Sequence, residues 1–406
     1  MSKFLPYSPD QAALLPASVK DVLSDDHLCF FVHRAVEKLN LMVFEEAYGE
    51  EGRRAYAPAL MLKVWLYGYL LGVTSSRRLE QRIREDLAFR YLAGGATPDY
   101  WALNDFLRRH RRAANDVFTQ VLELARAAGL VKLGHVAIDS TRVAANASRH
   151  RVDSEKRLRQ QRARLRKQVR AWQRGMQDQD PDEGAGTTLA AEQVRKLEQQ
   201  LEQIPQRLER LKKSKQRQLS RTDADARFLR QARGYVLGYS AEVAVDENHL
   251  IVAQRITQNA SDNQSLVPMV EQVKRVCGRN PVQVSADTAF FTAAAVDELA
   301  ERGVDPYVPD VEMAREIKGG YRAGKKIGNR IVHHPTVLRM REKLRQPEGR
   351  RAYAQRKNQV EPVFGTLKEQ RGLRRFRRRG LAAVSTEWTL AAVAYNLGRL
   401  YAMIGN

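Results

Sequence analysis

Residues 135–141 read HVAIDST, a short apolar run with a β-branched content typical of a buried β-strand, and Asp139 follows its apolar part. The same arrangement returns in residues 281–287, PVQVSAD, which end on Asp287. An acid at the end of one buried strand can simply form a turn. Two such acids on separate strands of one sheet favour a shared site.

The sequence between and after these two segments completes an α/β pattern. Residues 234–246 and 249–258 alternate apolar with polar positions and are joined by a turn-like Asp-Glu-Asn, which predicts an antiparallel hairpin. Further elements are predicted by periodicity: helices over about 264–277 and 292–302, a strand over 305–311, and a helix around Glu361 after a long basic stretch. The predicted order is strand, hairpin, helix, strand, helix, strand, helix.

Residues 1–130 have helical periodicity. Two arginine-bearing segments, residues 77–86 and 100–112, each follow residues that can cap a helix. This pair is compatible with a helix-turn-helix, and an ordinary helical bundle with charged outer faces explains it nearly as well.

Residues 150–222 differ in composition from their surroundings, being rich in Arg, Gln, Lys and Glu, and we interpret them as an insertion. Apolar residues recur at steps of three and four in both halves, which predicts two helices with heptad seams around a Pro/Gly/Asp-rich connector. The predicted seam residues are Leu158, Leu165, Val169, Trp172 and Met176, then Val194, Leu197, Leu201, Ile204, Leu208 and Leu211. The simpler role for such a helical hairpin is packing or dimerisation, and DNA contact by its basic faces is the alternative.

The chain has 406 residues and a formal net charge of +22, an excess that attracts polyanions and favours phosphate contacts through counterion release. Residues 321–380 hold 19 Lys or Arg against four Glu and no Asp. We therefore expect a nucleic-acid surface in this segment. The most apolar window, residues 60–71, contains Lys63 and falls short of the ~20 residues of a membrane span, so no membrane partner is expected. The two cysteines, far apart in sequence, indicate neither a disulfide framework nor a zinc site, which fits a reducing cytoplasm.

Phosphoryl transfer on DNA by a two-metal mechanism requires oxygen ligands that hold two divalent ions ~3.5–4 Å apart. Mg²⁺ prefers carboxylates, so the ligands should be acids on rigid elements. Asp139 and Asp287 meet this requirement, and Glu361 joins them from a predicted helix that carries Lys357 and Lys368 near the same face. A surface ladder of salt bridges would explain that helix alone, whereas the two aspartates favour a metal site.

The sequence resembles the DDE transposases of bacterial insertion sequences, which have a ribonuclease-H-like core. The resemblance covers nearly the whole chain. Four stretches carry it: residues 136–148 (VAIDSTRVAANAS), 238–269 (GYSAEVAVDENHLIVAQRITQNASDNQSLVPM), 285–292 (SADTAFFT) and 353–380 (YAQRKNQVEPVFGTLKEQRGLRRFRRRG).

The last stretch is similar to the Tyr, Arg, Glu and Lys signature of one subgroup, which implies Tyr353, Arg356, Glu361 and Lys368. Arg356 leaves four residues before the glutamate where the signature has three, and Lys357 leaves three, so either cation can fill the Arg role. The residues that follow Asp287 also depart from the usual small residue and aromatic.

The resemblance implies an α/β fold, a mixed sheet flanked by helices, with a helical N-terminal domain and an inserted helical hairpin. It implies Asp139, Asp287 and Glu361 as catalytic residues and as ligands of two Mg²⁺ ions, with Mn²⁺ as a possible substitute. The DNA-binding residues expected are Tyr353, Arg356, Lys357, Lys368, Arg374, Arg375, Arg377 and Arg378. The expected domains are residues 1–130 for DNA-end binding or dimerisation, 131–149 and 223–380 for the catalytic core, 150–222 for the hairpin, and 381–406 for a C-terminal helix.

The function that the resemblance implies is binding of terminal inverted repeats, cleavage at the element ends, and joining of the 3′-hydroxyls to target DNA. Double-stranded DNA would be the partner, a homodimer the form in the synaptic complex, and the bacterial cytoplasm, in association with the nucleoid, the location. The alternatives are a nuclease with the same core and a catalytically inactive, sequence-specific DNA-binding regulator derived from a transposase.

Overall fold

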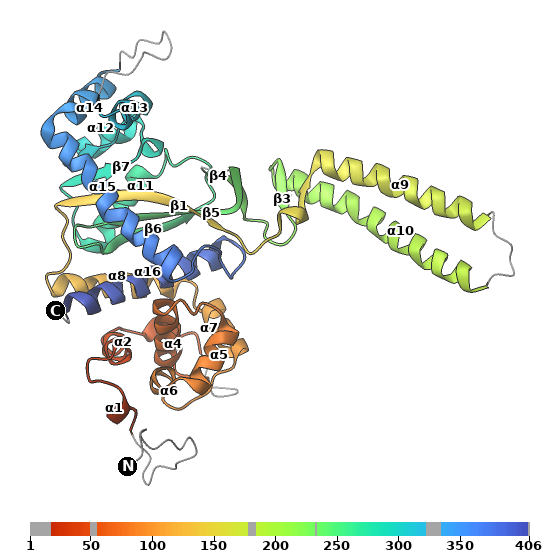
Figure 1. Cartoon of the computed structure of the whole chain (residues 1–406), viewed down its shortest axis with the longest axis horizontal. Coiled ribbons are helices and arrows are strands. Elements are labelled where there is room, and N and C mark those ends of the chain that lie inside the picture. Colours follow the sequence, from red (N-terminus) through yellow and green to blue (C-terminus); the bar gives the residue numbers. More distant parts are fainter. Residues whose placement is uncertain (1–17, 49–54, 178–183, 232–233, 322–333, 405–406) are drawn as a thin grey trace, which may run out of the picture.

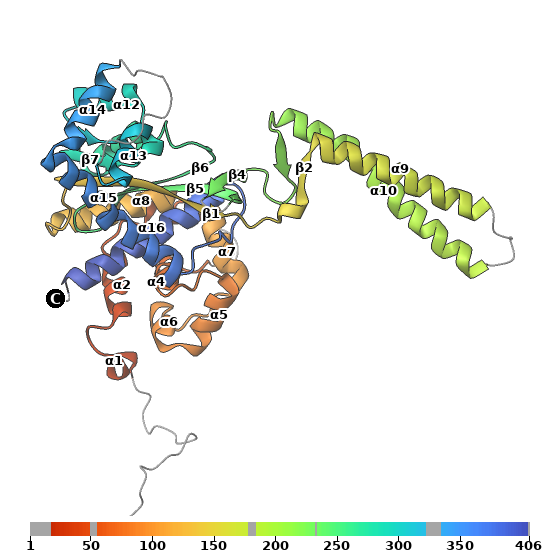
Figure 2. The same cartoon turned by 45° about the horizontal axis from the view of Figure 1, so that its top comes forward.

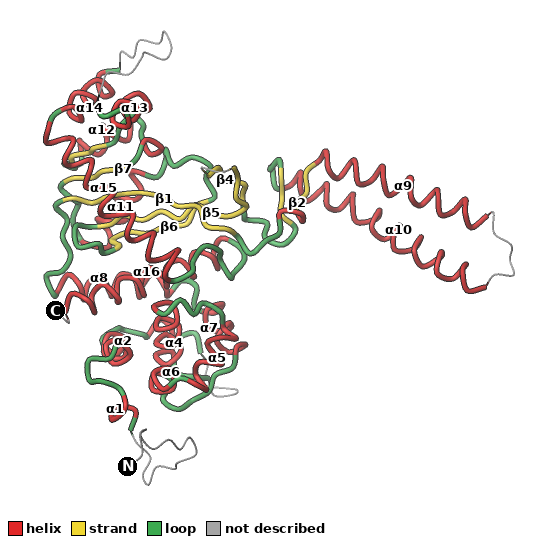
Figure 3. Tube along the Cα trace, in the orientation of Figure 1, coloured by secondary structure: helices red, strands yellow, loops and turns green. Residues whose placement is uncertain are grey.

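A mixed six-stranded sheet lies at the centre of the computed structural model, which describes the chain except residues 1–17, 49–54, 178–183, 232–233, 322–333 and 405–406 (Figures 1 and 3). Its strands are β1 (His135–Ala144), β4 (Arg227–Gln231), β5 (Gly234–Val245), β6 (Ile251–Thr257), β7 (Gln283–Ala286) and β8 (Asp305–Tyr307). β5 lies between β6 and β1 and is antiparallel to both, while β1, β7 and β8 are parallel neighbours. β4 pairs with the first part of β5.

The strand order β6-β5-β1-β7-β8 is that of a ribonuclease-H-like core, which confirms the predicted fold class. The predicted hairpin is β5 and β6, with a register shift at Ala244 and Val245 just before the turn. One detail of the sequence interpretation is wrong: β1 does not end at Asp139 but continues to Ala144, because its second half pairs with β5 after β7 has ended.

Helices cover both faces of the sheet. Alternate residues of β1 point to opposite faces, and His135, Asp139 and Thr141 all contact residues of one C-terminal segment that begins with α15 (Pro347–Gly365). Ser140, on the other face, bonds to Asp262 in the loop that precedes α11 (Leu266–Cys277). α8 (Ala113–Ala127) and α16 (Leu381–Ile404) pack together along β6 and join the sheet to the N-terminal helices.

The N-terminal region is a helical bundle centred on the buried α4 (Figure 2). Its helices are α1 (Val19–Val22), α2 (Leu28–Glu37), α3 (Met42–Glu45), α4 (Pro58–Leu70), α5 (Ser76–Glu85), α6 (Leu87–Leu92) and α7 (Tyr100–Arg109). The two helix-turn-helix candidates are α5 and α7. They contact each other, and the Glu80 carboxylate accepts the Tyr100 N–H at 3.1 Å. However, α6 and a loop separate them in sequence, so the bundle interpretation fits better than a helix-turn-helix joined by a short turn.

The insertion forms an antiparallel arm of two helices, α9 (Glu155–Gln177) and α10 (Gly184–Lys213), that projects from the core (Figure 1). A two-stranded ribbon of β2 (Val152–Ser154) and β3 (Gln218–Ser220) forms its base. Predicted seam residues fill the space between the helices, among them Leu158, Leu165, Ile204 and Leu211. The seam does not include Trp172, whose side chain is 45% exposed, and the side chain of Met176 lies outside the described residues.

Asp246, in the hairpin turn, is fully buried, and its carboxylate accepts three backbone hydrogen bonds. Its Oδ1 accepts the backbone N–H groups of Asn248 and Leu250, and its Oδ2 accepts that of Lys132 at 2.9 Å. Burial raises the pKa of this carboxyl to about 6, although the three N–H donors oppose the rise. A turn acid would be expected to tolerate substitution, whereas this one joins the start of the core to the hairpin.

We expect Asp246→Asn to lower the free energy of unfolding by about 1–3 kcal/mol, since the new amide nitrogen would face the Lys132 N–H and leave it without an acceptor. Urea denaturation measures the loss, and Glu247→Gln at the exposed neighbouring position is the matched control. Because the folded-state pKa of Asp246 is raised, its contribution to stability is largest below about pH 4 and is lost as the pH rises through about 6. At about pH 4, where this contribution is present, equal stability of the two variants would contradict this role.

Candidate active site

The two aspartates predicted from the sequence lie side by side. β1 and β7 are parallel, with Ile138 opposite Ala286, so Asp139 and Asp287 occupy the next position on each strand and the same face of the sheet. Asp287 leaves the strand there and caps a 3₁₀ turn, Thr288–Phe290, where its Oδ1 accepts the Ala289 N–H at 2.7 Å. The carboxyl end of β7 thus places a second acid beside the acid in the middle of β1.

α15 passes over this face and brings a cation to the pair (Figure 1). Arg356 Nη1 donates to Asp139 Oδ2 at 2.5 Å, and both side chains are largely buried, at 10% and 20% exposed. The Tyr353 ring packs beside the same guanidinium, with 5.7 Å between the guanidinium carbon and the ring centre. Burial raises the pKa of the Asp139 carboxyl to about 6; Arg356 opposes the rise and the nearby Asp287 adds to it. The electrostatic effect of Asp287 on Asp139 agrees with their neighbouring positions.

Glu361 and Lys357 lie on α15 with exposed side chains. Seven residues after Glu361, in a π-helical turn (Thr366–Gln370), Lys368 Nζ donates to Thr141 Oγ1 and, at 3.2 Å, to the Arg142 carbonyl. Burial lowers the pKa of Lys368. In the part of the chain that the structure describes, no group of three or more Asp, Glu, His or Cys lies close enough to hold a metal ion. The fold therefore brings Asp139 and Asp287 together, while Glu361 stands on the flank of the helix above them.

A buried hydrogen bond between α15 and the start of β1 holds α15 on the sheet. Gln359, three residues from Arg356, pairs through its Oε1 with His135 Nδ1 at 2.9 Å. Its backbone carbonyl lies 3.2 Å from His249 Nδ1 in the hairpin turn. Burial lowers the pKa of His135, which favours the neutral imidazole. Sequence analysis did not identify Gln359, although its helical spacing between Arg356 and Val363 is a signal that it faces the sheet.

Two protein-family models match the chain, and one of them covers the segments that carry Asp139 and Asp287. The model described as transposase DDE domain matches residues 132–397, and the one described as transposase domain (DUF772) matches residues 17–109. The chain belongs to the DDE transposase family. Comparison with curated proteins and with solved structures gave no match. Among the described helices of the transposase, none is both long enough and apolar enough to cross a membrane.

The segment after Lys368 forms a firmly anchored loop of the transposase, residues 374–379, which we term the arginine loop. Phe376, fully buried, and the backbone of Ala144 hold it to the end of β1, through N–H to carbonyl bonds of 3.1 and 2.9 Å. The buried carboxylate of Glu387 on α16 accepts the N–H groups of Arg377 and Arg378 at 3.0 Å. These anchors leave Arg375 and Arg377 exposed at fixed positions.

The cations of the arginine loop differ in their surroundings. Arg374 pairs with the exposed Glu369. Arg378 points inward, where its guanidinium lies 6.0 Å from the Trp65 ring centre and near Asn104, and burial lowers its pKa.

The loop also lies between two open cavities of about 510 and 530 Å³. The first is bounded by α7 and contains the exposed Trp101 and Arg108; the second extends to Arg149 and Arg151 at the base of the arm. Sequence analysis did not identify these flanking residues, because they become neighbours only in the fold.

Several cations of the basic segment 321–380 are neutralised by acids of other elements in the folded structure. Its residues 322–333 lie outside the described part of the chain. Helix α14 (Pro335–Arg345) packs near α12 (Ala293–Glu301) and α13 (Val311–Lys318), whose acids and flanking acids neutralise its cations. The ion pairs are Arg339–Asp297, Arg341–Asp310, Arg341–Glu312, Lys343–Asp305 and Arg345–Glu316. The exposed cations beyond α15 are therefore better candidates for a DNA surface than those of α14.

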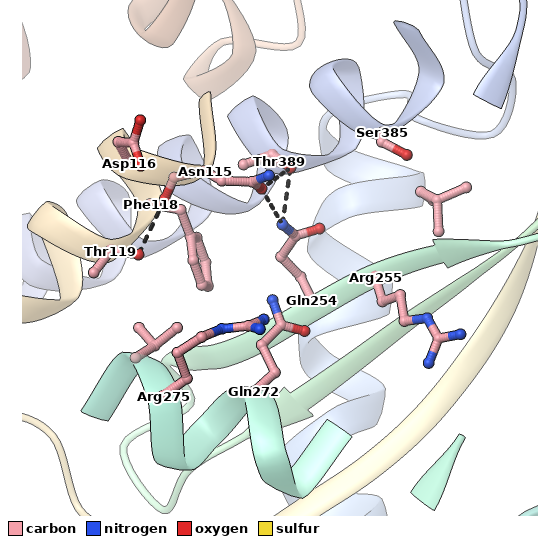
Figure 4. A pocket seen from close by; sticks show the side chains of 12 residues that line it. Asn115, Asp116, Phe118, Thr119, Gln254, Arg255, Gln272, Arg275, Ser385 and Thr389 are labelled. Carbon is pink, nitrogen blue, oxygen red and sulfur yellow. Dashed lines mark hydrogen bonds between the residues drawn. The ribbon is translucent and has the colours of Figure 1, made fainter. Parts of the chain in front are cut away.

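A further cavity of about 570 Å³ lies between α8, β6, α11 and α16 (Figure 4). Gln254 Nε2 donates to Thr389 Oγ1 at 2.8 Å in its wall, and Asn115 extends this network. None of the predicted catalytic or DNA-binding residues lines it. The bonds among Asn115, Gln254 and Thr389 join α8, β6 and α16, which is the pattern of a junction that fastens helices to the sheet edge.

Proposed function

We propose that this transposase cleaves DNA at the ends of its element and joins the freed 3′-hydroxyls to target DNA by metal-dependent phosphoryl transfer. The observation that supports this most directly is the placement of Asp139 and Asp287 on one face of adjoining strands in a ribonuclease-H-like sheet. α15 adds Arg356 and Glu361 from above, and the π-helical turn that follows it adds Lys368. The N-terminal bundle and the arginine loop provide surfaces beyond what hydrolysis alone needs, which favours transposition over simple nuclease activity.

The donors present suit hard divalent ions such as Mg²⁺, for which Mn²⁺ can substitute, because they are carboxylate oxygens on rigid elements. Asp139 and Asp287 fit a shared ion, and Glu361 would complete a site for two ions from α15. When bound, such ions activate the attacking oxygen and stabilise the leaving one. The Glu361 side chain is exposed on α15, where it is accessible to an ion.

The cations around the aspartates have distinct roles in this proposal. Arg356 neutralises Asp139 and so limits the repulsion between two neighbouring carboxylates. This contact also favours Arg356 over Lys357 for the Arg role of the family signature. Lys368, held against Thr141, and the exposed Lys357 would contact the phosphodiester backbone on either side of the scissile bond.

The proposed partners are duplex DNA carrying the terminal inverted repeats and target DNA, bound by a homodimer in association with the bacterial nucleoid. A catalytically inactive regulator would need only the basic surfaces. The paired aspartates under α15 favour an enzyme instead. Labelled duplexes with the element's own terminal repeats, incubated with the protein and Mg²⁺, Mn²⁺ or EDTA, test this directly. We expect 3′-hydroxyl ends and joined products with either metal, and uncut DNA in every metal condition would refute the proposal.

The exposed positions of the arginine loop predict a particular salt dependence. Replacing Arg375 and Arg377 by Gln should reduce the slope of log affinity against log salt by about 1.8, or ~0.9 for each phosphate that is no longer neutralised. The reduction should be the same on specific and random duplexes, because phosphate contacts carry no sequence information. Fluorescence anisotropy over a series of salt concentrations measures the slope. The control replaces Arg302 and Arg339, which pair with acids on α12, and an equal reduction there would argue against a specific role for the loop.

A further inference from the structure

The outer surface of the arm is strongly asymmetric in charge. α9 contains nine Lys or Arg and a single Glu, whereas α10 contains six Lys or Arg and four Glu. At 100° per residue, six of the α9 cations fall within a sector of roughly 100° on the side away from the seam. This α9 stripe consists of Lys156, Arg159, Arg166, Lys167, Arg170 and Arg174, all exposed.

The α9 stripe is not neutralised by the arm itself. Among the described residues, Arg159 is the member of the stripe that pairs with an acid, Glu155, one turn earlier. On α10, by contrast, Lys196 and Lys213 each pair with a Glu of their own helix. Like charges at helical spacings of four, as at Arg166, Arg170 and Arg174, repel each other and destabilise an isolated helix. A polyanion bound along the stripe would relieve that repulsion.

Most apolar side chains described in the arm lie in its seam, and Trp172 is an exposed exception. Leu158 and Leu165 of α9 are buried against Ile204 and Leu211 of α10, so the seam is satisfied within one chain. A second copy of the chain would therefore meet a face that is cationic rather than apolar. Two such faces repel each other, which makes self-association through the stripe unfavourable.

The base of the arm fixes its direction. Asp153 on β2 accepts from Arg207 of α10 through both oxygens, at 2.9 and 2.5 Å, and both side chains are largely buried. The β2–β3 ribbon and the bond from the Arg221 N–H to the Arg151 carbonyl, 2.9 Å, connect this pair to the core. Figures 1 and 2 show the arm extending well beyond the sheet from this base. The stripe is thus held at a distance from the aspartates.

We propose that the α9 stripe binds the phosphate backbone of duplex DNA at a distance from the cleavage site, which makes the arm a second DNA-binding surface. From Lys156 to Arg174 the stripe is about 27 Å long at 1.5 Å per residue. That length matches about eight base pairs at 3.4 Å each. Cations at intervals of four residues, about 6 Å, can reach successive phosphates of one strand. The inference rests on the proposed DNA binding by the transposase and extends the expected footprint.

The test compares two full-length variants that lose the same charge from opposite helices of the arm. One carries Arg159→Gln, Arg166→Gln and Arg170→Gln on α9; the other carries Arg195→Gln, Arg210→Gln and Lys212→Gln, exposed cations of α10. Gln preserves helix propensity, and circular dichroism checks that the arm remains folded. Each is titrated with a short duplex that holds only the terminal repeat and with one extended by about 20 base pairs on both sides, more than twice the length of the stripe.

On the extended duplex, we expect the α9 variant to lose a salt slope of about 2.7 and at least about tenfold in affinity at about 0.1 M salt. On the short duplex it should bind like the parent, and the α10 variant should resemble the parent on both. If the two variants behave alike while the parent binds, the arm inference is wrong and the proposed function is unaffected. If the parent binds neither duplex, the proposed function itself fails. A change of the α9 variant in sedimentation with unchanged DNA binding would assign the arm to dimerisation and overturn the inference.

Discussion

Replacing Asp139 or Asp287 by Asn, or Glu361 by Gln, should reduce DNA end cleavage by about 10³-fold or more while end binding stays nearly intact. Each change keeps the side-chain size and removes the charge that a hard divalent ion requires. The loss corresponds to about 4 kcal/mol of transition-state stabilisation, in the range of a missing metal contact or preorganised donor. Single-turnover cleavage of labelled terminal repeats in Mg²⁺ measures the rate, and anisotropy measures binding.

The three variants differ in what else they disturb, which makes the comparison informative. Asp139→Asn weakens the buried contact with Arg356, so its fold must be checked by thermal unfolding. Glu361 is exposed, so Glu361→Gln tests its ligand role with little effect on stability. Glu369→Gln is the matched control, since this exposed acid lies on the next turns and pairs only with Arg374 among the described residues. If any one of the Asp139, Asp287 and Glu361 variants cleaves at the wild-type rate, that residue is not a metal ligand. If all three do, the protein is a DNA-binding protein without this catalytic site.

Much of the fold could be predicted because buried strands and amphipathic helices leave periodic patterns. The hairpin of β5 and β6, the strand β7 and the helices α11 and α12 all lie where apolar periodicity indicated them. Short elements escaped prediction, such as the three-residue strands β2 and β3 at the base of the arm, because so few residues carry no recognisable period. β1 was predicted too short, since a strand that carries Asp139, Thr141 and Arg142 loses its apolar pattern where it passes the site.

The candidate site was partly predictable for a related reason. Two acids after apolar runs could be recognised locally, and strand pairing then placed Asp139 beside Asp287. The net charge of residues 321–380 overstated the basic surface, because a count along the sequence cannot include acids from other elements. Asp305 and Glu316 neutralise Lys343 and Arg345 only after folding. The structural role of Asp246 could not be predicted, since a turn acid that accepts three backbone N–H groups cannot be distinguished in sequence from an exposed one.

Asp262→Ala is expected to destabilise the transposase by about 3–5 kcal/mol, the cost of leaving a buried cation without its partner. Asp262 forms a two-pronged ion pair with Arg142, at 3.1 and 3.0 Å, and the side chains are 3% and 15% exposed. Its carboxylate also accepts from Ser140 at 2.8 Å and lies 3.4 Å from Ser240. Urea denaturation followed by circular dichroism measures the loss. Glu271→Ala, which breaks the exposed pair with Arg302, is the control and should cost at most about 1 kcal/mol.

This ion pair connects stability with the active site through the alternation of β1. Ser140 and Arg142 point to the face of Asp262, while Asp139 and Thr141 point to the face of α15. The Arg142 carbonyl also accepts from Lys368, so a displacement of Arg142 would disturb contacts on both faces of the sheet. If the cost comes from a stranded charge, then Arg142→Met combined with Asp262→Leu should recover most of the stability that Asp262→Ala loses. If the double variant is no more stable than the single one, the hydrogen bonds to Ser140 and Ser240, rather than the charge pair, hold the loop before α11 to the sheet.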